Sequence, residues 1–166
     1  MAEKLLFQGT VSTSNPTGIT SVSTTNPLPT MESFGANVTT KSVTYTGAAG
    51  LGAVGTTTRF TVSGVVKFRL FAVCGTNLAG ATATIAAGVT GNTTGIIGAT
   101  TATNILAGHL WFSTSPGYVT AISGVAENIT SANITETIAT AAVSGGQLTY
   151  YCLWTPVSDG ATVTAA

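Results

Sequence analysis

The sequence predicts an all-β protein: an antiparallel β-sandwich or jelly-roll-like domain with an extended N-terminal arm. Short segments alternate apolar residues with Ser or Thr, which is the two-residue period of a strand with one buried face. Clusters of Gly, Asn, Ser and Pro separate these segments and supply turns. Charged residues make up only 6% of the chain. A chain of 166 residues is expected to form one domain, which we place at residues 41–166 after an arm at residues 1–40.

The charge balance limits the classes of partner. The formal net charge is zero, so copies of the chain repel one another weakly and a homo-oligomer is expected. The five Lys and Arg residues form no basic patch, which argues against direct nucleic-acid binding. The uncharged span 70–126 contains no run of about 18 apolar residues, so no membrane association is expected. The apolar run at residues 5–7 is too short for a secretion signal.

The predicted arm combines prolines with sparse apolar residues. Pro16, Pro27 and Pro29 each remove a backbone donor and favour extended geometry in the preceding residue, which excludes a helix. A solvated linker does not need apolar side chains, whereas an arm that crosses a neighbouring subunit does. Ordinary disorder of the isolated chain is the alternative. The candidate partner-contact residues in the arm are Leu5, Leu6, Phe7, Leu28, Met31 and Phe34.

The segment Thr57–Cys74 predicts the clearest β-hairpin, with its turn at Ser63–Gly64. In its first strand, Phe60 and Val62 alternate with polar residues. We therefore expect Phe60 and Val62 to be buried and Arg59 to lie on the exposed face.

The return strand of this hairpin has one fully apolar face and one mixed face. Lys67 and Arg69 share the mixed, exposed face, where paired cations either remain solvated and oppose aggregation or meet acidic groups on a partner subunit. We carry Lys67 and Arg69 forward as candidate partner contacts. The apolar face consists of Val66, Phe68, Leu70, Ala72 and Cys74.

The rest of the domain predicts further short strands. The glycine-rich segment 47–55 is expected to be a loop, and it lacks the GK[ST] sequence of a phosphate site. Trp111 and Phe112 are expected to anchor the core or an interface. The expected strands are Ser42–Thr46, Ala81–Ala87, Gly95–Ala99, Asn104–Phe112, Tyr118–Ile122, Ile134–Val143 and Gln147–Thr155.

The last strand, Gln147–Thr155, places Leu148, Tyr150, Cys152 and Trp154 on one face. We expect this face to share one core with the apolar face of the predicted hairpin, with Cys74 near Cys152. Without a secretion signal both thiols are expected to be reduced, and a single disulfide is the alternative.

No residue set predicts catalysis, a cofactor or a small-molecule substrate. His109 has neither a serine nor a cysteine nucleophile pattern around it and is expected to be structural. Two cysteines without a nearby histidine do not make a metal site. Glu127 and Glu136 could form a glycosidase pair only across a cleft lined with aromatic residues, which the sequence does not indicate.

Three stretches together resemble a family of small tailed-phage virion proteins that are similar in character to head decoration, or cement, proteins. They are RFTVSGVVKFRLFAVCGTNL (Arg59–Leu78), the spacing of Gly91–Pro116, and TIATAAVSGGQLTYYCLWTPVSDGATV (Thr137–Val163). The resemblance extends from about Thr57 to the C-terminus and is strongest in YYCLWTPVSDG. It is a pattern of strands and turns and includes no catalytic residues.

The resemblance implies a non-enzymatic subunit on the capsid surface of a bacteriophage virion, made in the host cytoplasm. Its partners would be the major capsid protein and copies of itself, as a trimer or another homo-oligomer. A receptor-binding tail-fibre or adhesin module is the alternative, because it would share the Thr- and Gly-rich composition. Such a module would be expected to show an internal repeat, and no period of 20–50 residues is evident.

Overall fold

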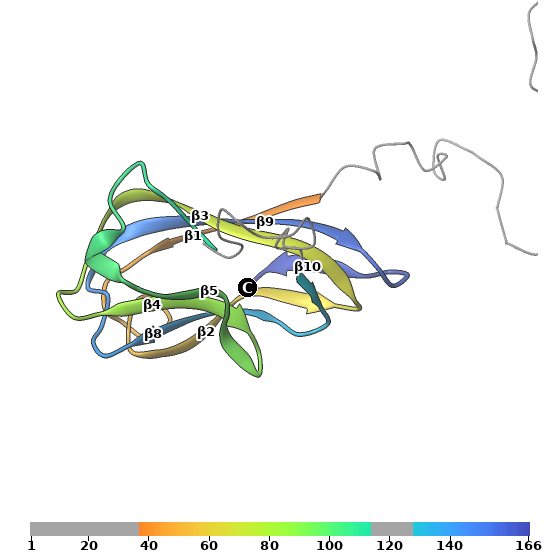
Figure 1. Ribbon diagram of the computed structural model, residues 1–166, viewed down its shortest axis with the longest axis horizontal. Helices are drawn as coiled ribbons and strands as arrows, with labels where there is room; N and C mark the ends of the chain where they lie inside the picture. Colours follow the sequence, from red (N-terminus) through yellow and green to blue (C-terminus); the bar gives the residue numbers. More distant parts are fainter. Residues whose placement is uncertain (1–36, 114–127) are drawn as a thin grey trace, which may run out of the picture. The chain divides into compact units, whose positions relative to one another are not determined.

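Two antiparallel five-stranded sheets pack face to face in the computed structural model, which describes residues 37–113 and 128–166 (Figure 1). Sheet I has the order β1-β9-β3-β6, with β7 also pairing to β3, and sheet II has the order β10-β2-β8-β4-β5. The expected all-β sandwich is confirmed. The strands are β1 (Asn37–Thr44), β2 (Gly55–Ser63), β3 (Val66–Ala79), β4 (Thr84–Val89), β5 (Asn92–Thr101), β6 (Leu110–Phe112), β7 (Asn128–Thr130), β8 (Ile134–Ala139), β9 (Gly145–Pro156) and β10 (Thr162–Ala165).

The core lies between the sheets, and β3 and β9 contribute its centre. Leu70 lies opposite Cys152 and Ala72 lies opposite Tyr150, so the two apolar faces that the sequence predicts are adjacent on one sheet. All four side chains are buried. The prediction of a shared core is therefore confirmed, and directly opposed pairs of this kind stabilise the sheet.

The two cysteines are not neighbours in this core. Cys74 lies opposite Leu148, whereas Cys152 lies opposite Leu70, which precedes Cys74 by four residues in β3. At about 3.3 Å per residue this separates them by about 13 Å, which exceeds the reach of a disulfide. Both thiols are free and buried. The expectation that Cys74 and Cys152 lie close together was wrong.

The predicted Thr57–Cys74 hairpin was also wrong, because β2 and β3 belong to different sheets. The chain crosses the core at Ser63–Gly64, where Gly64 has φ +72°. The backbone N–H of Val65 donates to Ser158 Oγ at 2.8 Å instead of to a partner across a hairpin turn. A Cβ on Gly64 would lie 2.7 Å from the same Oγ. A connection that crosses to the other sheet and a hairpin turn that returns within one sheet join strands with the same alternation of apolar and polar residues. The sequence pattern therefore could not distinguish the two.

Several expected boundaries moved. The predicted strand Asn104–Phe112 is a 3-10 helix (η2, Ala102–Asn104) followed by a turn and the short β6. The C-terminal tail contributes β10, which pairs with β2. β1 begins at Asn37, inside the range assigned to the arm, and the rest of that range lies outside the described residues, as does the predicted strand Tyr118–Ile122.

Each sheet edge has a feature that opposes pairing with another strand. β6, β7 and β10 have only three or four residues each. β1 contacts β10 through Thr39 Oγ1, which donates to the Val163 carbonyl at 3.0 Å. β1 also places Lys41 opposite the inward-facing Tyr150. Two register shifts interrupt β5 along β4. Short edges, inward charges and bulges are the means by which sheets avoid edge-to-edge aggregation.

Candidate functional site

A buried ion pair lies between the sheets. Arg59 and Glu136 are 5% and 1% exposed, and Arg59 Nη2 lies 2.7 Å from Glu136 Oε1. Arg59 Nε donates to Glu136 Oε2 at 3.2 Å, and Nη1 donates to the Gly50 carbonyl at 3.0 Å. A register shift between Thr58 and Phe60 interrupts the alternation of β2, and both Arg59 and Phe60 are buried. The expectation that Arg59 lies on an exposed face was therefore wrong.

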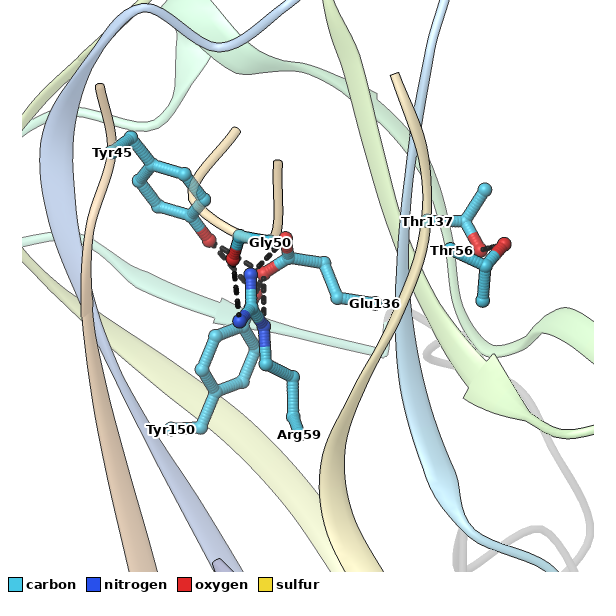
Figure 2. Close-up of polar contacts among 7 residues, drawn as sticks. All are labelled: Tyr45, Gly50, Thr56, Arg59, Glu136, Thr137 and Tyr150. Atoms are coloured by element: carbon cyan, nitrogen blue, oxygen red, sulfur yellow. Dashed lines mark hydrogen bonds and ion pairs between the residues drawn. The ribbon is translucent and has the colours of Figure 1, made fainter. Parts of the chain in front are cut away.

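Two tyrosines from sheet I complete the cluster (Figure 2). Tyr45, just after β1, donates its hydroxyl to Glu136 Oε2 at 2.6 Å. Tyr150 on β9 donates to the same oxygen, and the two hydroxyls are 3.2 Å apart. Because Arg59 and Glu136 belong to sheet II, these hydrogen bonds join the two sheets through one carboxylate. We call Tyr45, Arg59, Glu136 and Tyr150 the inter-sheet cluster.

The environment shifts the titration of the cluster. Burial raises the pKa of both Tyr45 and Tyr150 above the ordinary value, and the negative charge of Glu136 adds to the shift. Burial alone would lower the pKa of Arg59. The hydrogen bond and the charge of Glu136 outweigh it and raise that pKa. Near neutral pH both tyrosine hydroxyls of the cluster are therefore neutral.

The inter-sheet cluster links the two sheets, and its polar atoms are not arranged for acid–base chemistry. Both oxygens of Glu136 already accept hydrogen bonds, and the side chain is 1% exposed. A general acid or base must come within hydrogen-bond reach of a substrate. Glu127, the proposed glycosidase partner, lies outside the described residues. In residues 37–113 and 128–166, no three His, Cys, Asp or Glu side chains could together hold a metal ion.

The sequence contained a signal for part of this cluster. Glu136 lies two residues from Ile134 and from Ile138, and strand alternation puts all three on the buried face. A carboxylate at a buried strand position requires a partner, which implies a buried cation. The partner could not be identified in this way, because the irregularity in β2 that brings Arg59 inward leaves no mark on the alternation.

The outer face of sheet I is an exposed apolar surface, which we call the apolar face. Phe71 lies opposite Tyr151 on one side and Phe112 on the other, and the rings of Phe71 and Tyr151 stack at 5.1 Å. This row crosses the middle of the face. The apolar face consists of the exposed Val38, Leu110, Phe112 and Ile129 and the half-buried Phe71, Val73, Tyr151 and Leu153.

Two of the predicted contact residues lie on this face. Lys67 is half-buried opposite Ile129, and Arg69 is exposed opposite Leu153. The structure thus brings the two cations to the apolar face, whereas the third cation of the segment, Arg59, is inside. The other predicted contacts, Leu5, Leu6, Phe7, Leu28, Met31 and Phe34, lie outside the described residues.

The two aromatic residues of β6 have different environments. Trp111 is buried and donates its indole N–H to Thr100 Oγ1 at 3.1 Å, so it anchors the core. Phe112 is 51% exposed on the apolar face. His109 is exposed in the preceding turn, and its carbonyl accepts the Cys74 N–H at 2.9 Å. Among residues 37–113 and 128–166, no helix is long and apolar enough to cross a membrane.

Comparisons with known proteins give little further information. No family model and no curated protein matches the chain. Among solved structures, a chain described as "Cyanophage Pam1 capsid asymmetric unit" is similar with a TM-score of 0.33 and 17% identity, over 74% of this chain and 88% of that chain. A TM-score of 0.33 is too low to establish a common fold. The fold described above therefore rests on the sheet topology of this chain.

Proposed function

We propose that this chain is a non-enzymatic virion structural protein, and specifically a capsid decoration protein that binds and stabilises the lattice of a major coat protein. The observation that carries this proposal is the apolar face, an exposed apolar surface that four strand positions of sheet I form together. Contiguous apolar patches of this kind mark interaction sites on soluble proteins. The inter-sheet cluster offers no competing catalytic site, because its polar atoms are buried and hydrogen-bonded to one another.

The composition supports the same role. With 6% charged residues and zero formal net charge, the chain has little electrostatic repulsion to keep copies apart. Many copies bound to one shell also gain avidity, so each contact needs only modest affinity. The likeness of Thr57 to the C-terminus to tailed-phage virion proteins gives the proposal its specific form.

Stoichiometry in purified particles tests this function. A decoration protein is expected to occur in a fixed, large ratio to the major coat protein, measured by quantitative mass spectrometry of intact virions. A few copies per particle, found in the tail fraction after heads and tails are separated, would instead establish the tail-fibre or receptor-binding alternative. Heads assembled without the chain should also be less resistant to heat than heads that carry it.

The arm is proposed to extend the contact with neighbouring subunits. The arm binds in an ordered form only if the free energy gained by burying its apolar side chains exceeds the conformational entropy cost of ordering it. Removing residues 1–34 is expected to weaken binding to heads and to leave the thermal unfolding of residues 37–166 unchanged. Equal binding by the shortened and full-length chains would refute a role for the arm.

A further inference from the structure

The edges of both sheets are protected against strand addition by a partner protein. The outer faces of the two sheets are therefore the surfaces to compare as docking surfaces. Strand addition requires an edge with a regular row of free backbone groups. The described edges are short, bulged, or protected by Lys41 and by contact between β1 and β10. For the described residues, this favours a partner that packs against a face of the sandwich over one that adds a strand to an edge.

The two outer faces differ in chemistry. The outer face of sheet II carries small and hydroxylated side chains, and some of these pair with one another, as Thr56 and Thr137 do at 2.9 Å (Figure 2). Such a face loses little by remaining hydrated. Its residues include Thr56, Thr61, Ser63, Thr137, Thr162 and Thr164. The apolar face of sheet I is the one whose burial removes a large apolar area from water.

The apolar face has the composition of an interface centre. It spans four strand positions and about six residues of β3, a footprint of about 300 Å² at ordinary strand spacings. The stacked Phe71 and Tyr151 form a rigid centre, flanked by the exposed Phe112. Aromatic residues and arginine are enriched where binding energy concentrates. The footprint is smaller than the roughly 800 Å² per partner of a stable isolated interface, which suits a subunit held by many contacts.

The charge on this face selects among partners. Its charged side chains are Lys67 and Arg69, both cationic. Among the described residues the carboxylates are Glu136, which is buried, and Asp159, which is in the turn after β9. Two copies that met through their apolar faces would bring cations together, and the carboxylates of the described residues, Glu136 and Asp159, are buried or in the turn after β9. A different protein that carries a carboxylate at this position would form an ion pair with Arg69.

We infer that the apolar face is the surface that docks on the coat lattice, and that it recognises an apolar protein surface carrying a carboxylate opposite Arg69. The hydroxylated face of sheet II then remains in solvent. This inference rests on the proposed function, since it names the chemistry of the partner that the function requires.

Binding of full-length variants to heads assembled without this chain tests the inference. Phe112→Ser and Val38→Ser are each expected to raise the dissociation constant about tenfold, the effect of losing about 1.4 kcal/mol. Arg69→Glu is expected to weaken binding most at low salt, because screening reduces the effect of a charge contact. Val54→Ser is the matched control, since Val38 and Val54 are 58% and 59% exposed and Val54 directly precedes β2 of sheet II. Unchanged melting temperatures show that each variant is folded.

The outcomes separate the inference from the proposed function. If all three face variants bound to heads as tightly as the wild-type chain does, the apolar face would be overturned as the docking surface. The proposed decoration function would remain intact. A concentration-dependent dimer in ultracentrifugation that Phe112→Ser abolishes would show that a second copy occupies the face, and would also overturn the inference. Heads that bind none of the wild-type chain would overturn the proposed function and, with it, this partner.

Discussion

Glu136 Oε1 accepts a hydrogen bond from Arg59 Nη2 at 2.7 Å, between two strands that are adjacent in sheet II and deep in the sandwich. Neither charge has solvent as an alternative partner, since the side chains are 5% and 1% exposed. The pair is therefore costly to break from one side only.

Glu136→Gln is expected to lower the free energy of unfolding by about 3–5 kcal/mol, because it leaves Arg59 buried without a counter-charge. The double variant Arg59→Met with Glu136→Gln should be destabilised by less than the sum of the two single losses, since it leaves no unpaired charge in the core. Urea denaturation of the four proteins measures this coupling. Asp159→Asn, at an exposed carboxylate, is the control and should change little. Additive losses in the double variant would contradict a coupled pair.

Stability is expected to fall as the pH rises above about 10. The pKa values of Tyr45 and Tyr150 are raised above the ordinary value of 10.0 by burial and by the charge of Glu136. Below pH 10 both the folded and unfolded chains keep these protons. Above it the unfolded chain releases protons that the folded chain retains, so stability decreases by up to about 1.4 kcal/mol per pH unit for each tyrosine.

Tyr45→Phe separates this effect from other alkaline titrations. The variant should be less stable at pH 8, because it loses a hydrogen bond to a carboxylate worth about 1.5–3 kcal/mol. Its stability should decline less steeply between pH 10 and 12 than that of the wild type. Parallel curves for the two proteins would show that Tyr45 does not titrate on unfolding.

Cys152 is expected to resist alkylation in the folded protein. Burial raises the pKa of its thiol to about 12, so little thiolate forms at pH 8, and the side chain is buried in the core. Iodoacetamide at pH 8 should modify Cys152 only as fast as the domain unfolds, as followed by mass spectrometry. Rapid labelling of the native chain at a rate that does not change with urea would contradict this burial.

Gly88→Ala is expected to destabilise the domain by about 1–3 kcal/mol, the usual cost of overpacking. A Cβ at Gly88 would lie 2.1 Å from the Asn92 carbonyl oxygen, because β5 folds closely over β4 at this point. Gly98→Ala is the matched control in the neighbouring strand, with open space around the new Cβ. It should change stability by less than about 0.5 kcal/mol. Equal melting temperatures for the two variants would contradict the close approach.

The alternation of apolar residues was enough to predict the faces of the strands but not their connections. It correctly paired the inward faces of β3 and β9, since Leu70, Tyr150 and Cys152 had to be buried somewhere. It could not tell whether the Ser63–Gly64 connection turns back within one sheet or crosses to the other. That choice depends on Ser158, which is far along the chain and binds the Val65 N–H.

For the apolar face and the inter-sheet cluster too, alternation predicted which way some side chains face but not which residues surround them. Strand alternation places Lys67 and Arg69 on an outer face, and the structure has them there. The exposed residues that surround them, such as Val38 and Ile129, come from strands distant in the chain, so their neighbourhood is a property of the register. The burial of Arg59 follows from an irregularity in β2, and no local preference in its sequence predicts one.

The crossing at Ser63–Gly64 has a consequence for how the protein is made. Among the described strands, β2 pairs with β8 and β10 and β1 pairs with β9, so neither of these early strands has a sheet partner before residue 134 is synthesised. Pairings of such high sequence separation form slowly. A chain that stops before Thr162 lacks the edge strand β10 that covers β2. Products of termination before Thr162 therefore carry an incomplete sheet II, with one side of β2 unpaired.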